Sequence, residues 1–349
     1  MDGLRRRKSD GEKLVATFYE VVRDQQIAWR RWALADQTPG FHKGKPYPHI
    51  LPRRRWGMNL WPDIAAGVPA YLREKRVQAH TAKHNLCSSW ILCANLYFPF
   101  RNPAGYDLLA AFLRERLSLD VSSVDGIDLE YEAEDENYKP AKLLGEDQGS
   151  RGAGQTSPDV AFTITTPPER RGLILVESKF TEHWFYECSG HRRRSKDRAA
   201  NPSPNRCDGL VAVLRDPAKQ CHLTSWGRKY WDYLHFDVAY AGHLSSCPAA
   251  SGAYQLFRQQ ALAEALVDSH HWALVVSAVA FDERNADNLF RVIRSSDGVR
   301  DVRSVWPELL RLRAPFKTFS HQAWAAWVRA HGGGAWRDWL RYMQERYGY

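Results

Sequence analysis

Two short segments in the middle of the chain, residues 160–164 and 173–176, constrain the fold more than any other feature of the sequence. In the first, apolar residues occupy every second position from Val160, which is typical of a half-buried strand. The second is a short apolar run bounded by Gly172, which indicates another strand. Because few residues separate the two segments, they predict a β-hairpin.

Patterns on both sides of this hairpin predict an α/β protein. Apolar residues recur at helical spacing in residues 84–97, 106–117 and 253–267. Residues 127–131 and 272–281 have the patterns of strands. We therefore expect a mixed central sheet flanked by helices.

The composition divides the chain into three regions. Residues 1–80 are basic and mostly helical in pattern, residues 81–285 hold the α/β core, and residues 286–349 are rich in Trp and helical in pattern. An insert at about residues 188–232 is rich in Arg, Pro, Ser and Asn and carries several Cys residues. We expect one core with helical N- and C-terminal extensions, rather than two equal domains.

Charged residues occur at the ends of the two central strands. Asp159 begins the first strand, and Glu177 and Lys179 follow the apolar run of the second, where a spacing of two places them on one face. The hairpin would bring both carboxylates together, which favours a hard cation such as Mg²⁺ or Mn²⁺, with the backbone carbonyl of Ser178 as a further ligand. Lys179 would orient or help deprotonate an attacking water and stabilise charge on a phosphate. The pattern predicts phosphodiester hydrolysis; the alternative is an exposed ion pair at a strand end.

Three segments that include these residues resemble the PD-(D/E)XK nuclease superfamily, and more narrowly a family of bacterial restriction endonucleases. They are His84-Asn85-Leu86 with Ser88, Ser89, Cys93 and Asn95; Ser157-Pro158-Asp159 with Leu175 to Glu182; and Tyr254-Gln255-Leu256-Phe257-Arg258-Gln259. The resemblance implies a restriction-endonuclease-like core over roughly residues 84–285. It also implies that Asp159 and Glu177 bind the metal and that Lys179 is the catalytic lysine.

The same resemblance assigns roles to the helix at residues 253–267. Gln255 would hold the attacking water or a metal-bound water, and Arg258 would bind a phosphate. Many members of the superfamily carry a further acidic residue on the helix ahead of the sheet, but residues 84–97 contain none. The candidates for a substitute are Glu115, Asp128 and Glu130, among which the sequence does not decide.

The charge balance indicates a polyanionic partner. The chain has 49 Lys and Arg residues against 40 Asp and Glu, a net charge of +9. We expect DNA. The expected phosphate contacts in the insert are Arg192, Arg193, Arg194, Lys196 and Arg198. The triplet at residues 53–55 is a further candidate, although a solvated charge run explains it as well.

Membrane insertion and secretion are not expected. No stretch approaches the ~18 uncharged apolar residues of a membrane-spanning helix. Polar residues at positions 9–12 occupy the place where a secretory signal would be apolar. We therefore expect a cytoplasmic protein with reduced cysteines.

The cysteines of the insert suggest a structural metal. The candidate ligands for a tetrahedral zinc ion are Cys188, Cys207, Cys221 and His222. Metal binding would stabilise a segment with few apolar residues. His191 competes for the fourth position, because the adjacent Cys221 and His222 cannot easily share one ion. An iron–sulfur cluster would need Cys247 as well, and unrelated thiols are the remaining alternative.

Together these features lead to a main hypothesis and two alternatives. The first is a divalent-metal-dependent DNA endonuclease that serves bacterial restriction or phage defence. The second is a DNA-binding or scaffold subunit of a defence complex, whose nuclease domain is inactive alone. A zinc enzyme built on the insert is the least favoured, because no His-Glu pair accompanies the cysteines. The aromatic C-terminal helices could form a homodimer surface, although packing within the chain explains them equally well.

Overall fold

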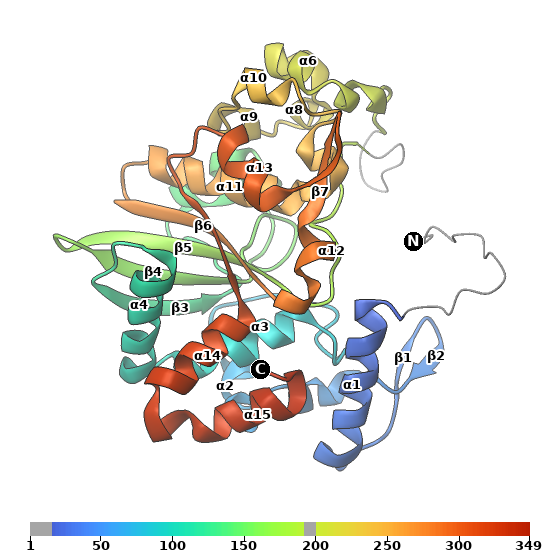
Figure 1. Ribbon diagram of the computed structural model, residues 1–349, viewed down its shortest axis with the longest axis vertical. Coiled ribbons are helices and arrows are strands. Elements are labelled where there is room, and N and C mark those ends of the chain that lie inside the picture. Colours follow the sequence, from blue (N-terminus) through green and yellow to red (C-terminus); the bar gives the residue numbers. More distant parts are fainter. Residues whose placement is uncertain (1–15, 192–199) are drawn as a thin grey trace.

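A five-stranded mixed sheet forms the centre of the computed structural model, which describes residues 16–191 and 200–349 (Figure 1). Its strands, in spatial order, are β3 (Ser123–Leu129), β4 (Val160–Thr166), β5 (Arg170–Lys179), β6 (Leu274–Phe281) and β9 (Phe316–Ser320). Strands β3, β4 and β5 are antiparallel, whereas β5, β6 and β9 are parallel. The predicted α/β fold with a mixed central sheet is confirmed.

The hairpin predicted from the sequence consists of β4 and β5. Val160 pairs with Val176, and Phe162 pairs with Ile174. The last eight residues of β5 are all buried, because helices cover both faces of the sheet at this strand. A strand that is buried on both faces needs an almost continuous apolar run, and residues 173–176 provide it.

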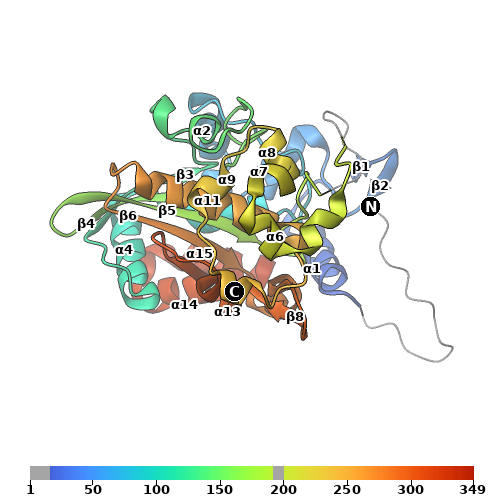
Figure 2. The ribbon, with the colours of Figure 1, turned by 90° about the horizontal axis from the view of Figure 1, so that it is seen from above.

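Helices lie on the two faces of the sheet in separate layers, and Figure 2 shows the strands between them. Three helices belong to the core on one face: α3 (Ser89–Tyr97), α4 (Pro103–Leu117) and α14 (His321–His331). Helix α11 (Tyr254–Asp268) covers the other. Side chains of β5 alternate between them, so that Ile174 and Val176 join the first core and Leu173 and Leu175 the second.

The ends of several elements differ from the sequence pattern because of capping residues. Helix α3 begins at Ser89, since the Ser88 side chain accepts from the amide of Ile91. Helix α4 begins at Pro103, after an Asn102 cap. Strand β3 ends at Leu129, two residues earlier than the alternating pattern indicates.

The N-terminal region is less helical than expected. It contains α1 (Phe18–Ala33), a hairpin of β1 (Gly40–His42) and β2 (Lys45–Tyr47), and α2 (Gly67–Glu74). The two strands are only three residues long, too short for a period of two to be visible in the sequence.

The C-terminal region also contains strands that the expectation of a helical extension missed. Its elements are α12 (Ala286–Phe290), β7 (Arg291–Ser295), β8 (Gly298–Asp301), α13 (Val302–Leu309), β9, α14 and α15 (Arg337–Tyr347). Strand β9 completes the central sheet, so the core extends beyond residue 285. Its five residues pair in parallel with β6, a long-range contact that no local pattern reveals.

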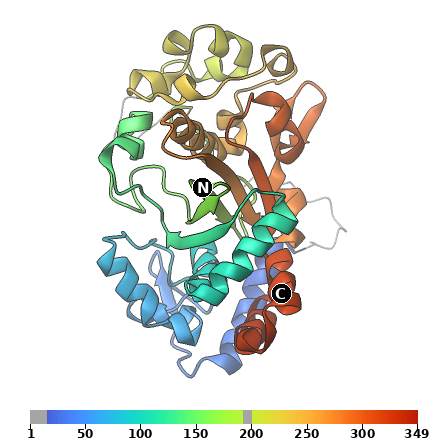
Figure 3. The same cartoon turned by 90° about the vertical axis from the view of Figure 1, so that its left-hand side faces the viewer.

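The insert lies at one end of the molecule and α1, α14 and α15 lie at the other, whereas α13 and β7 of the C-terminal region lie on the side of the insert. Figure 3 shows the yellow helices of the insert at one end, and the blue helix α1 and the deep red helices α14 and α15 at the other. Short helices of the insert and its surroundings are α5 (Pro140–Leu144), α6 (Leu210–Arg215), α7 (Pro217–Gln220), α8 (His222–Ser225), α9 (Tyr230–Tyr233) and α10 (Val238–Ala241). Helix α15 contacts α1, where Arg346 is fully buried and donates to Gln26.

Candidate active site

Three acidic residues lie side by side on adjacent strands. Glu130 directly follows β3, Asp159 directly precedes β4, and Glu177 lies on β5 one position beyond the residue that pairs with Val160. The amide of Glu130 donates to the carbonyl oxygen of Asp159 at 2.9 Å, which continues the pairing of β3 with β4. Glu130 and Glu177 are buried, and Asp159 is partly buried. The ends of three neighbouring strands thus form an acidic row.

Lys179, Glu177 and Gln255 form a closed triangle of hydrogen bonds at this row. The Nζ atom of Lys179 lies 2.7 Å from Oε1 of Glu177 and 2.9 Å from Oε1 of Gln255. Gln255 Nε2 donates to the same oxygen of Glu177 at 2.7 Å. Gln255 lies in the first turn of α11, so this helix brings its side chain onto the face that carries the strand residues. The structure brings together all four side chains for which the sequence predicts catalytic roles, Asp159, Glu177, Lys179 and Gln255.

Burial and mutual repulsion raise the pKa values of two of the acids. Burial of the carboxyl group raises the pKa of Asp159 well above its ordinary value, and the charge of Glu177 raises it further, although the amide of Ser178 donates to Asp159 at 2.7 Å. Burial, with the charge of Glu177, raises the pKa of Glu130 to about 8. Two close carboxylates resist ionising together unless a cation joins them.

At Lys179 the effect of neighbouring charges on the pKa is larger than the effect of burial. Burial alone lowers the pKa of Lys179, but the neighbouring carboxylates of Glu177, Glu182 and Asp159 outweigh it and raise the pKa above the ordinary value. Lys179 therefore carries its charge in the folded protein. Lys179 is 3 % exposed, so its ammonium group is a buried positive charge beside the acidic row.

Of the three candidates for an additional acid, only Glu130 lies in the row. Glu115 is exposed on α4, and Asp128 accepts a hydrogen bond from the Tyr71 hydroxyl at 2.9 Å. The backbone of Glu130 has a φ of 50°, which is uncommon for a residue other than glycine, and Arg151 Nε donates to its carbonyl oxygen at 2.6 Å. The sequence placed Glu130 within the expected strand at residues 127–131 and did not distinguish it from the other two candidates.

The donor set suits a hard divalent cation. Carboxylate oxygens are the ligands that Mg²⁺ and Mn²⁺ prefer, and a cation would relieve the repulsion that raises the pKa of Asp159. In the residues that the structure describes, no three His, Cys, Asp or Glu side chains are placed so that they could hold a metal ion together. Oε1 of Glu177 is occupied by Lys179 and Gln255 instead, so a metal would have to replace or share these bonds.

The sequence led us to expect that Arg258 binds a phosphate, but its guanidinium group is already paired within the protein. Its Nε atom lies 3.2 Å from Oε1 of Glu146 and 3.0 Å from Oγ1 of Thr156. The Tyr230 hydroxyl donates to the same carboxylate at 2.7 Å. Glu146 belongs to a polar segment whose long-range partner the sequence does not indicate. The ion pair holds the residues that lead to Asp159.

Further side chains near the row were not singled out by the sequence. The Tyr186 ring lies 5.7 Å from Nζ of Lys179, and the Phe185 ring lies 5.9 Å from it. Burial lowers the pKa of His80, Glu182 raises it and Lys179 lowers it further. The His80 imidazole is therefore close enough to the site to interact with its charges. These residues come from segments without regular patterns, where spacing carries no information.

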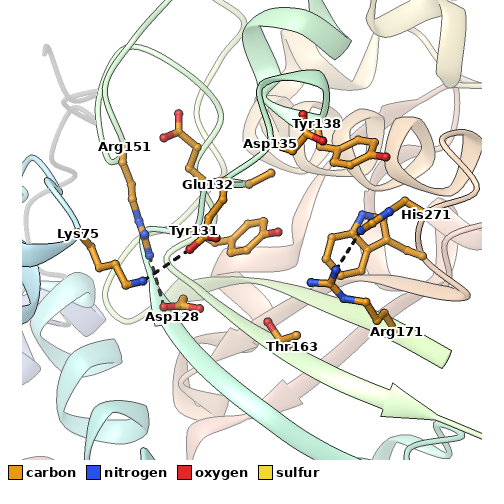
Figure 4. A pocket seen from close by; sticks show the side chains of 13 residues that line it. Lys75, Asp128, Tyr131, Glu132, Asp135, Tyr138, Arg151, Thr163, Arg171 and His271 are labelled. Carbon is orange, nitrogen blue, oxygen red and sulfur yellow. Dashed lines mark hydrogen bonds and ion pairs between the residues drawn. The ribbon is translucent and has the colours of Figure 1, made fainter. Parts of the chain in front are cut away.

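A pocket extends along the sheet from Asp128, near the end of β3, to Arg171, at the opposite end of β5 from Glu177 (Figure 4). Lys75 and Arg151 lie on one side of it and Arg171 and His271 on the other. Arg151 is 3.6 Å from Asp128, which lies two positions before Glu130 on the chain. The pocket therefore combines basic and aromatic groups with the acidic residues Asp128, Glu132, Glu134 and Asp135, and the three residues of the acidic row are not in its lining.

Most of the predicted phosphate contacts fall outside the described residues. This is the case for Arg192, Arg193, Arg194, Lys196 and Arg198. In the N-terminal triplet, Arg53 and Arg54 are exposed, and Arg55 forms an ion pair of 2.7 Å with Asp36.

The predicted zinc ligands are only partly brought together. Cys188, Cys207 and Cys221 line one cavity. The fourth potential ligand in its lining is Cys247, and His222 is not part of that lining. The His222 ring instead contacts Trp226 edge-on.

A family described as "Restriction Endonuclease associating with ARP" matches the chain over residues 18–348. The chain belongs to this family. The match covers the sheet, the insert and both terminal regions, so the REase-ARP family includes the helical extensions as well as the core. Searches of curated proteins and of solved structures found no match. Within the part of this REase-ARP chain that the structure describes, no helix has the length and apolar character needed to cross a membrane.

Proposed function

We propose that this REase-ARP protein is a divalent-metal-dependent DNA endonuclease of the PD-(D/E)XK type, acting in bacterial restriction or phage defence. The observation that carries the proposal is the row of Glu130, Asp159 and Glu177 with the charged Lys179 beside it. A structural ion pair would not need two further carboxylates with raised pKa values at the same place. The family description supports a restriction endonuclease, and the row provides a place for the chemistry.

Asp159, Glu177 and the backbone carbonyl of Ser178 would hold Mg²⁺ or Mn²⁺, with Glu130 as a further acidic ligand. When bound, the metal polarises a phosphate oxygen and activates water. The remaining roles belong to side chains of this chain. Lys179 would stabilise negative charge that develops on the phosphate, because its raised pKa keeps it protonated. This favours an electrostatic role for Lys179 over that of a general base.

Gln255 would set the position of Lys179. Its side-chain oxygen accepts a hydrogen bond from Nζ of Lys179, and its Nε2 donates to Glu177. Gln255 therefore orients the side chains of both Lys179 and Glu177. Once a metal engages Glu177, the Gln255 amide would be available to a water. The contact of Arg258 with Thr156 would support the turn before Asp159 rather than a phosphate.

DNA is the proposed substrate because the chain is basic around an acidic centre. The net charge of +9 attracts polyanions, while the carboxylate row requires a cation before phosphate can approach. Lys75 and Arg151, on the side of the pocket that is close to Glu130, are candidates for contacts with the DNA backbone.

The test is cleavage of plasmid, linear duplex and single-stranded DNA with Mg²⁺ or Mn²⁺. We expect the wild type to cut duplex DNA, and Lys179→Ala and Asp159→Asn to be slower by about 10²–10³-fold. Lys142→Ala, which alters an exposed lysine, is the matched control and should cut normally. All variants should bind DNA with the same salt dependence. If Lys179→Ala cuts as fast as the wild type, the proposed site is wrong.

A second candidate function is a DNA-binding or scaffold subunit whose nuclease centre is silent alone. The family description favours it, because association with a protein designated ARP is part of the name. In this case the purified chain would bind DNA but cut none of the substrates with either metal. Addition of the partner should then restore cleavage in the wild type and not in Lys179→Ala.

A further inference from the structure

Four cysteines from separate parts of the sequence meet in the insert. Cys188, Cys207, Cys221 and Cys247 line one small cavity, and none of them is in a disulfide. Burial raises the pKa of the Cys247 thiol, and the nearby Cys207 and Cys221 raise it further. Burial also raises the pKa of Cys188, with Cys247 as its strongest neighbour. The four thiols are thus mutual neighbours.

Backbone hydrogen bonds hold the cysteine segments together. The amide of Cys247 donates to the carbonyl oxygen of Cys207 at 2.7 Å, although the two residues are far apart in the sequence. The amide of Ala250 donates to the carbonyl oxygen of Cys247 at 2.9 Å and closes the turn that follows this cysteine.

Among the described residues, the rest of the cavity lining provides no positive side chain to accompany thiolates. Its other lining residues are Val213, Leu223, Trp231, Ala249, Ala250 and Phe257. Negative charge in apolar surroundings is expensive unless a cation is present. A metal ion within the cavity is the direct way to provide one.

We propose that Cys188, Cys207, Cys221 and Cys247 together bind one Zn²⁺ ion as four thiolates. Four-coordinate binding by cysteine is the common arrangement of structural zinc, and it leaves no open position for substrate. In the described part of the chain no three His, Cys, Asp or Glu side chains are placed so that they could hold a metal ion, so zinc binding would have to draw the four sulfur atoms together. Cys247 replaces His222 as the fourth ligand, which avoids the use of two adjacent residues on one ion.

The zinc ion would join two segments that lead to the candidate active site. Cys188 follows the segment that leaves β5, and Cys247 precedes the turn that enters α11. These segments are already paired, since the amide of Gln255 donates to the carbonyl oxygen of Phe185 at 2.9 Å, and the amide of Cys188 donates to that of Ala249 at 2.8 Å. The cluster would thus fix the strand end that carries Lys179 relative to the helix that carries Gln255.

The decisive measurement is the metal content of the wild-type protein, prepared from zinc-supplemented culture and reconstituted with zinc under reducing conditions. We expect one zinc per chain by elemental analysis. Chelator in excess should lower the melting temperature, and added zinc should restore it. Absence of zinc after reconstitution, or iron with inorganic sulfide in its place, would overturn the assignment.

Variants separate the proposed ligands from other cysteines. Cys221→Ala and Cys247→Ala should lose the zinc and its effect on the melting temperature. Cys87→Ala, which alters a buried cysteine outside the cluster, and His222→Ala should both keep one zinc per chain. A Cys247→Ala protein that retains zinc contradicts the proposal, as does a His222→Ala protein that loses it. Because the wild-type stoichiometry is measured first, a variant that does not fold leaves the proposal testable.

Discussion

Nε2 of Gln255 lies 2.7 Å from Oε1 of Glu177, although the two residues are 78 positions apart in the sequence. Through this contact the first turn of α11 meets the end of β5, and the same amide group accepts from Lys179 at 2.9 Å. One neutral side chain therefore fixes both members of an ion pair. The contact connects the part of the site that the strands form to the part that the helix forms.

Replacement of Gln255 by Ala should lower the turnover number of DNA cleavage by about 10–100-fold and leave DNA affinity nearly unchanged. Lys179 would keep its charge but lose its fixed direction, and small misplacements of a reacting group have effects of this size. Single-turnover cleavage and a binding isotherm measure the two quantities separately.

Gln259→Ala is the contrasting variant on the same helix. Gln259 donates to the backbone of Leu175 and Ala278, so its loss should lower stability more than turnover. If both variants change only the melting temperature, Gln255 has a structural role alone.

The metal-free protein should become less stable as the pH rises from about 5 to about 8. The pKa of Glu130 is about 8 in the folded protein against 4.5 ordinarily, so the folded state binds more protons than the unfolded state in this range. One such proton corresponds to about 1.4 kcal/mol of unfolding free energy per pH unit. Urea denaturation at several pH values, in the presence of a chelator, measures the slope.

Glu130→Gln should flatten this pH dependence, whereas Glu115→Gln, which alters an exposed glutamate, should not. Addition of Mg²⁺ should increase the stability of the wild type most at high pH, where the carboxylates are free to bind it. An unchanged slope in Glu130→Gln would show that this residue does not retain its proton.

Breaking the ion pair of Glu146 and Arg258 should destabilise the protein by about 3–5 kcal/mol, because Glu146→Gln leaves the Arg258 charge without its carboxylate. The double variant Glu146→Gln with Arg258→Met should recover part of this loss, since no buried charge remains. Thermal unfolding of the wild type, the two single variants and the double variant forms a double-mutant cycle, which measures the coupling energy of the two side chains. Strictly additive effects would show that the two side chains are not coupled.

Arg346→Met should lower the unfolding free energy by several kcal/mol, at about 1–3 kcal/mol for each buried acceptor left unpaired. The guanidinium is 0 % exposed and donates to Gln26, Asn59 and Tyr342. Arg341→Met, on the same helix, removes an exposed pair with Asp338 and should change stability by less than about 1 kcal/mol. Equal effects of the two variants would contradict this account.

The strands that could be predicted are those with strong local patterns. The hairpin of β4 and β5 was visible because Val160 to Ile164 alternate and residues 173–176 are continuously apolar. Strand β9 was not, because its five residues depend on parallel pairing with β6. Short strands whose partners are distant in the sequence leave too little periodicity to detect.

The same distinction holds for the site. Glu177 and Lys179 were expected on one face from their spacing alone, and the structure places them 2.7 Å apart. The ion pair of Arg258 with Glu146 was missed because its partner lies in a segment without a regular pattern. Sequence spacing constrains neighbours on one element, whereas contacts between elements depend on the whole fold.

The contact between α1 and α15 also bears on the order in which the molecule can be completed. Gln26 Nε2 donates to the carbonyl oxygen of Arg346 at 2.8 Å, across a separation of 320 residues. During translation, every residue between Gln26 and Arg346 must be added before this contact can form. Throughout this time part of the surface of α1 lacks its partner, and pairings of such long range form slowly. During synthesis the N-terminal helix can therefore complete its packing only after the last helix has been made.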